Sequence, residues 1–140
     1  NFYLTGVQLE VGDSASDFEH ESFAETLIRC QRYFERMDDE GNSSVPFGVG
    51  YNESTSQARG MIYFKTIKRA DPTISISAAS SFCNVSTGST AAASTLTFDS
   101  QLPWGCRYIC TSSNTTLVDG GASILQRFQN DATIEIDSEL

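Results

Sequence analysis

Short runs of alternating apolar and polar residues, separated by turn-forming residues, occupy most of the chain after residue 44. A period of two residues is typical of strands that bury one face, and it argues against an all-helical bundle. We expect strands at 45–51, 58–67, 73–77, 82–85, 95–98, 107–111, 122–128 and 133–136. Clusters of Gly, Asn, Asp, Ser and Pro predict loops at 38–44, 87–94 and 99–105.

One helix is predicted near the N-terminus, at about residues 22–33. Ser22 and Glu25 have the S-x-x-E spacing of a capping box. Apolar residues then recur at steps of four, three and four on one helical face, at Phe23, Leu27, Cys30 and Phe34. Residues 2–11 predict an opening strand with a bulge at Gly6. Together these elements predict a mainly β domain over residues 1–140, a β-sandwich or jelly roll with one N-terminal helix.

The charge balance is acidic, with a net charge of -9 from 9 basic and 18 acidic residues. A nucleic-acid-binding domain normally carries a basic patch, and the cluster of Lys65, Lys68 and Arg69 is too small to form one. No apolar run approaches the roughly 20 residues that span a bilayer, so we expect neither a nucleic-acid partner nor membrane insertion. The sequence shows no signal peptide and starts at Asn1, which suggests a piece of a longer protein.

Four cysteines are present, at positions 30, 83, 106 and 110. Their spacing matches no zinc-binding pattern. Cys106 and Cys110 would point to one face of a strand and would not bridge each other easily. We expect buried free thiols, with a bridge from Cys83 to Cys106 or Cys110 as the alternative.

Catalytic and metal-binding motifs are lacking in the sequence. His20 is the single histidine, and we expect it to pack near the start of the helix. Asp99 and Asp119 could pair as glycosidase carboxylates, but no pattern brings them together. The acidic loop at 38–40 lacks the spacing of a calcium loop. We therefore expect no enzyme activity, no metal and no cofactor.

Ligand binding is predicted instead at aromatic and polar residues in loops. The single tryptophan, Trp104, lies between Pro103 and Gly105, a position that is unusual for the middle of a strand. A sugar ring stacks on an aromatic ring, while nearby amides and carboxylates bind its hydroxyl groups. Packing in the core or an interface is the alternative for Trp104, and the core is expected for Phe64, Phe98 and Phe128. The candidate ligand-binding residues are Trp104, Asp99, Gln101, Tyr51, Asn52, Asn114 and Asp119.

Several longer segments together resemble a known family. They are FYLTGVQLEVG at 2–12, FEH at 18–20, SF at 22–23, CQRYF at 30–34, ARG at 58–60, RADPT at 69–73 and IDSEL at 136–140. In this order they are similar to the C-terminal domain of phage tail-fibre and related virion proteins. The chain departs from the family pattern at Glu21, where arginine is usual, and at Ser138, where alanine is usual. Residues 83–121 carry no part of the resemblance.

The resemblance implies a virion component, in the tail or another external structure, assembled in the host cytoplasm with unpaired thiols. It implies a homotrimer, contacts with other virion tail proteins, and binding to a host surface polysaccharide. Residues 1–20 would lead into the domain or complete a preceding one. Two alternatives remain: a purely structural trimerising, capping or decoration module without a host ligand, and a glycan depolymerase.

Overall fold

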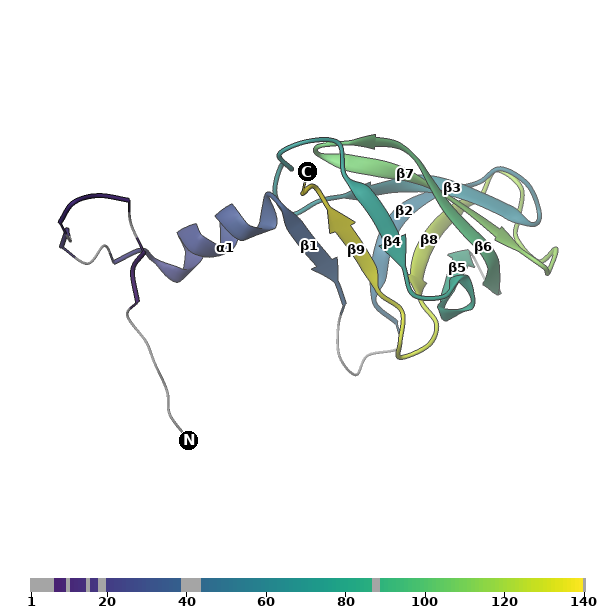
Figure 1. Ribbon diagram of the computed structural model, residues 1–140. Coiled ribbons are helices and arrows are strands. Elements are labelled where there is room, and N and C mark those ends of the chain that lie inside the picture. Colours follow the sequence, from purple (N-terminus) through teal and green to yellow (C-terminus); the bar gives the residue numbers. More distant parts are fainter. Residues whose placement is uncertain are drawn as a thin grey trace.

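The computed structural model describes residues 7–9, 11–14, 16–17, 20–38, 44–86 and 89–139. This part of the chain is mainly β with one α-helix, which confirms the predicted class (Figure 1). The elements are α1 (Phe23–Gln31), β1 (Phe34–Met37), β2 (Pro46–Asn52), β3 (Gln57–Tyr63), β4 (Thr73–Ile76), the 3-10 turn η1 (Ala79–Ser81), β5 (Phe82–Ser86), β6 (Ser89–Leu102), β7 (Gly105–Ser112), β8 (Ala122–Arg127) and β9 (Ile134–Asp137).

Six strands form a closed antiparallel barrel in the order β2-β3-β7-β6-β5-β8. The ring closes because β8 pairs with both β2 and β5, as at Val49 opposite Ile124 and at Val85 opposite Ile124. The other three strands form a separate sheet in the order β1-β9-β4. A β-sandwich is therefore not confirmed, because the barrel strands close on one another and leave no free edge among themselves.

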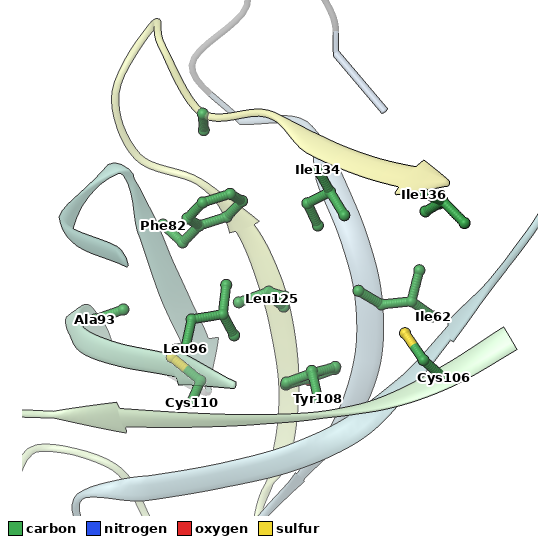
Figure 2. Packing of buried hydrophobic residues seen from close by; sticks show 11 residues of the cluster. Ile62, Phe82, Ala93, Leu96, Cys106, Tyr108, Cys110, Leu125, Ile134 and Ile136 are labelled. Carbon is green, nitrogen blue, oxygen red and sulfur yellow. The ribbon is translucent and has the colours of Figure 1, made fainter. Parts of the chain in front are cut away.

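The hydrophobic core joins the three-stranded sheet to the barrel. Ile134 and Ile136 of β9 face Ile62 and Leu125 of the barrel (Figure 2). Burial alternates along β7, where Cys106, Tyr108 and Cys110 point into the core. The remaining buried members are Phe82, Ala93, Leu96 and Ala132.

The aromatic residues expected in the core divide between two environments. Phe64 and Phe98 are partly buried and pack against the core. Phe128 does not, since 47% of it is exposed. The prediction for Phe128 was wrong because burial alternates along β8 and falls on Arg127, so the next residue faces outward.

Close contact between β2 and β3 depends on glycine. Gly50 pairs with Gly60, and the ring of Tyr108 lies over this part of the barrel wall. A Cβ atom on Gly60 would lie 2.2 Å from the Val49 carbonyl oxygen and 2.6 Å from Cε1 of Tyr108. The tyrosine ring thus fills the space that missing side chains leave inside the barrel.

Two predicted loops belong largely to β6. The expected loop at 87–94 was wrong from Ser89 onward, and residues 87–88 lie outside the described residues. Ala91 and Ala93 point into the barrel, and the other face of this part of the strand also carries small side chains. The sequence therefore shows no clear alternation of apolar and polar residues, and for this reason the strand was not predicted. The expected loop at 99–105 is shorter, since β6 runs to Leu102 and β7 begins at Gly105.

In the N-terminal part the predicted helix is present, but the segments before and after it differ from the prediction. The capping box is present, with Ser22 accepting from the Glu25 backbone and the Glu25 side chain accepting from the Ser22 backbone. The helix ends at Gln31, and residues 34–37 form a strand that the sequence analysis missed. Val11 and residues 7–9 belong to no strand, and the rest of the predicted opening strand lies outside the described residues.

A buried ion pair joins the end of α1 and β1 to the β3–β4 loop. Nζ of Lys68 lies 2.7 Å from Oε2 of Glu35, and both side chains are almost fully buried. The ammonium also donates to the carbonyl of Gln31 at 2.5 Å, and the backbone N–H of Arg69 donates to the carbonyl of Arg32. The C-terminal end of α1 is therefore attached to the domain, while the rest of the helix projects away from it (Figure 1).

All four cysteines are free. Cys83, Cys106 and Cys110 are buried, as predicted, and no bridge from Cys83 is formed. Cys30 is exposed, so the prediction of burial was wrong for this residue. The reason is that α1 packs none of its residues into the domain.

Candidate functional site: an aromatic pair beside a shallow hollow

Two exposed aromatic rings stack on the outer surface of the barrel. Trp104 and Tyr63 have ring centroids 5.9 Å apart and planes inclined by 26°. Trp104 is 45% exposed and Tyr63 is 63% exposed. Gly105 lies directly opposite Tyr63 on the neighbouring strand and has no side chain to cover the ring.

The tight turn between β6 and β7 holds Trp104 in this position. The carbonyl of Trp104 accepts a hydrogen bond from the Phe64 N–H at 3.2 Å, and the carbonyl of Pro103 accepts one from the Lys68 N–H at 2.7 Å. Lys68 is the residue of the buried ion pair. The turn is thus bonded to a fixed loop, and a ring fixed in advance loses little entropy when it binds a ligand.

A shallow hollow of about 240 Å³ lies along Tyr63. Its floor is apolar and comes from β2 and β3, with Phe47, Val49 and Met61 among its lining residues. A second hollow of about 250 Å³ shares Phe47 and Tyr63 and adds the charged side chains of Asp38 and Lys65. Tyr63 therefore belongs both to the aromatic pair and to the wall of these hollows.

An ion pair lies on the same outer face, near the aromatic pair. Nε of Arg107 donates to Oδ1 of Asp99 at 2.6 Å, and Nη2 of Arg107 donates to Oδ2. These bonds hold the pKa of the Asp99 carboxyl below its usual value and raise the pKa of Arg107. Arg107 lies opposite Met61, two residues along β3 from Tyr63. Both groups are charged at neutral pH and can bind hydroxyl groups with their free hydrogen-bonding positions.

The sequence-predicted residues divide between this site and the other end of the barrel. Trp104 and Asp99 lie at the site, and Gln101 lies between them in chain order, in the irregular segment of β6 before the turn. Tyr51 is 52% exposed on the same outer face. It is in register with Arg59, four residues along β3 from Tyr63, which is a distance of about 13 Å along the strand.

Asn52 is not available to a ligand, which corrects its place among the candidates. It is fully buried, and its side-chain amide donates to Oγ of Ser86 at 2.9 Å and to the carbonyl of Val118 at 2.8 Å. The physical reason is the period of the strand: Tyr51 points outward, so Asn52 must point into the barrel.

Asn114 and Asp119 are exposed but lie away from the aromatic pair. Asn114 follows β7, at the end of the barrel opposite the β6–β7 turn. Asp119 belongs to a turn whose Gly120 N–H donates to the carbonyl of Asn52, at the C-terminal end of β2. The seven predicted residues therefore do not form one site.

The two carboxylates considered for glycoside hydrolysis are also far apart. Asp99 is on β6, and Asp119 adjoins the end of β2. β2 and β6 are three strands apart in either direction around the six-stranded ring. Within the described residues, no group of three or more His, Cys, Asp or Glu side chains is placed to hold a metal ion.

Sequence reasoning missed Tyr63, Lys65 and Arg107. Tyr63 had a readable signal, because Phe64 was expected in the core and the residue before it in the strand must face outward. Arg107 had none, because its pairing with Asp99 depends on the register of β6 and β7.

Comparisons with protein-family models, with curated proteins and with solved structures found no match. In the described part of the chain, no helix has the length and apolar character needed to cross a membrane.

Proposed function

We propose that this chain is a non-enzymatic carbohydrate-binding domain of a phage tail fibre or a related virion protein. The observation that carries the binding function is the exposed Trp104–Tyr63 pair beside an apolar hollow. A pyranose presents an apolar face of C–H groups that packs on an aromatic ring. Its hydroxyl groups would meet charged side chains at the edge of the hollows, from Asp38 and Lys65 on one side and from the Asp99–Arg107 pair on the other.

The shape of the site supports a weak single-copy interaction. The hollows are shallow, and about half of each aromatic ring is exposed. Such a site buries little of its ligand, so useful attachment requires several copies acting together. This supports the proposed homotrimer, fixed to other tail proteins and directed at a host surface polysaccharide.

The phage setting is supported by the sequence resemblance. Three buried free thiols fit assembly in a reducing compartment such as the host cytoplasm, as proposed for a virion component. The alternative, a structural trimerising or capping module without a host ligand, is favoured by one observation, the exposed apolar face of α1. A depolymerase has less support, because Asp99 and Asp119 do not meet.

Binding to glycans tests the proposal directly. Purified protein is applied to an array of bacterial surface polysaccharides and to whole cells, together with Trp104→Ala and Tyr63→Ala. We expect each substitution to weaken binding about tenfold, because one stacked ring contributes on the order of 1.4 kcal/mol. Phe128→Ala is the matched control, since Phe128 is 47% exposed but lies outside the aromatic pair. We expect it to bind as the wild type does.

Two outcomes would count against the proposal. If the variants bind a glycan as tightly as the wild type, the aromatic pair is not the site. If the folded wild type binds no polysaccharide or cell, the structural alternative replaces the adhesin.

A further inference from the structure

A layer of buried polar side chains lies inside the barrel, at the end opposite the β6–β7 turn. It contains Asn52 of β2, Asn84 and Ser86 of β5, and Ser123 of β8, and the most exposed of them, Ser86, is 7% exposed. The Asn52 amide donates to Oγ of Ser86, and Oγ of Ser123 donates to Oδ1 of Asn84 at 3.5 Å. Tyr108 of β7 reaches the same layer, because its hydroxyl lies near Ser123.

Several atoms of this layer lack a hydrogen-bond partner within the described residues. They are Oδ1 of Asn52, Nδ2 of Asn84 and the hydroxyl of Tyr108, and all three residues are fully buried. The orientation of the Asn52 amide is fixed, since its Nδ2 donates to the carbonyl of Val118, which can only accept. Asn84 lies near the Cys110 thiol, which is a weak hydrogen-bonding group. Buried polar atoms are paired in the great majority of cases, because an unpaired one keeps the full cost of its lost hydration.

Small apolar neighbours leave space beside the two asparagines. Ala58 lies directly opposite Asn52, and Ala91 lies directly opposite Asn84. Both alanines are fully buried and pack with Leu117. Leu117 is 3% exposed, and its backbone N–H donates to a carbonyl of the β2–β3 turn. The layer is therefore closed to bulk solvent, and a partner for its polar atoms must be enclosed with them.

The chemistry of the unpaired atoms fits water. Oδ1 of Asn52 only accepts, Nδ2 of Asn84 only donates, and the hydroxyl of Tyr108 can do either. A water molecule does both, and buried waters make about three hydrogen bonds to groups that otherwise have no partner. The layer contains no charged side chain, so it offers nothing to balance the charge of an ion.

We propose that the barrel encloses ordered water, which accepts from Nδ2 of Asn84, donates to Oδ1 of Asn52 and bonds the hydroxyl of Tyr108. These residues come from β5, β2 and β7, and no two of these strands are neighbours in the ring. The water would join strands that the backbone ladder does not connect. The inference concerns the interior of the barrel and is independent of glycan binding on its outer face.

Water-selective NOE and ROE spectra of the full chain labelled with ¹⁵N test the proposal directly. The side-chain amide protons of Asn84 should show cross-peaks to water whose NOE and ROE have opposite signs, as expected for a long-lived bound molecule. Asn114 is the matched control, because its side-chain amide is exposed and meets only rapidly exchanging solvent. Absence of a long-lived cross-peak at Asn84 in the wild type would overturn the proposal.

Hydroxyl protons that exchange with water can produce similar cross-peaks. The spectra are therefore repeated with Ser123→Ala and with Tyr108→Phe, each of which removes one hydroxyl group from the layer. We expect the Asn84 cross-peak to persist in both variants, because the water is still held by the two asparagines. A peak that disappears with either hydroxyl group would be relayed through it and would count against the enclosed water.

Urea denaturation gives a second test that depends on the direction of the change. Removing a buried hydroxyl that has no partner leaves the urea midpoint unchanged or raises it, whereas removing one that is bonded to water lowers it. We expect a lower midpoint for Tyr108→Phe. Tyr63→Phe is the control and should keep the wild-type midpoint, since Tyr63 is 63% exposed. An unchanged or raised midpoint for Tyr108→Phe would contradict the proposal and leave the proposed glycan site unaffected.

Discussion

At the scale of single residues, the buried cysteines show how the core controls reactivity. Burial raises the pKa of the Cys83 thiol to about 11, and that of Cys106 and Cys110 to about 12. Burial also raises the pKa of the Tyr108 hydroxyl to about 12. The charged forms lose hydration inside the barrel, so these groups remain protonated and unreactive at neutral pH.

The protein should lose stability at alkaline pH. A group whose pKa is raised on folding stabilises the fold fully below its unfolded pKa, which is 9.0 for these thiols. That stability is lost as the pH rises from about 9 towards 12, by at most about 1.4 kcal/mol per pH unit for each buried group. Urea denaturation at pH values from 7 to 11, with the reduced protein, measures the change. A free energy of unfolding that stays constant above pH 9 would contradict this account.

Thiol labelling provides the control for that measurement. In the native protein at pH 8, Cys30 should react with a thiol reagent, and the three buried thiols should react after unfolding. Cys30→Ser should remove the rapid reaction and leave the alkaline transition unchanged.

At the scale of elements, the junction of α1, β1 and the β3–β4 loop depends on one buried ion pair. Glu35 accepts hydrogen bonds from the Lys65 N–H and from Nζ of Lys68. Lys68 also lies 5.5 Å from the centre of the Phe64 ring. These contacts fix both the C-terminal end of α1 and the β3–β4 loop, whose Lys68 N–H donates to the Pro103 carbonyl in the Trp104 turn.

Removing one member of this pair should be costly. Glu35→Ala leaves a buried ammonium without its carboxylate, and we expect a loss of about 3–5 kcal/mol in the free energy of unfolding, measured by urea denaturation. The double variant Glu35→Leu, Lys68→Met should lose less, because neither charge is then buried alone.

An exposed ion pair serves as the comparison. Arg36 lies 3.9 Å from Glu135, and their side chains are 50% and 41% exposed. Glu135→Ala should cost less than about 1 kcal/mol. Equal losses for Glu135→Ala and Glu35→Ala would show that the buried pair has no special structural role.

At the scale of the whole molecule, the described structure separates two surfaces. The barrel carries the aromatic pair, and α1 projects from the neighbouring sheet (Figure 1). In the proposed homotrimer, the barrels would present several weak sites together. Attachment strength then depends on assembly as much as on any one contact.

Assembly should therefore change avidity and leave the single site intact. On a polysaccharide-coated surface, an associated form of the protein should bind about 100-fold or more tightly than a monomeric form separated from it by size, since linked sites gain 10²–10⁴ in avidity. For a short soluble oligosaccharide the two forms should have the same affinity per chain, measured by calorimetry. Equal binding on the surface would contradict multivalent attachment.

Local residue patterns were sufficient for the features that depend on neighbours in the chain. The capping box predicted the start of α1, and the alternation of Thr73–Ile76 predicted β4. The burial of Cys83 followed from residue type. For the candidate site, the sequence placed Trp104 in a loop as a candidate for ligand binding, with packing in the core or an interface as the alternative, and the structure leaves it 45% exposed.

Only the tertiary structure decided which of these features meet. Closure of the barrel depends on pairing between β2 and β8, which lie far apart in the chain, and no local pattern encodes this register. Closure of the barrel placed Asn52 in the interior, and the pairing of β3 with β7 brought Tyr63 beside Trp104. By itself the sequence determined which segments extend and which residues are apolar. The contacts of the site depend on long-range strand pairing, and the exposure of α1 depends on which distant segments pack against it. The physical reason is that the neighbours of a strand or helix are set only when segments distant in the chain pack together.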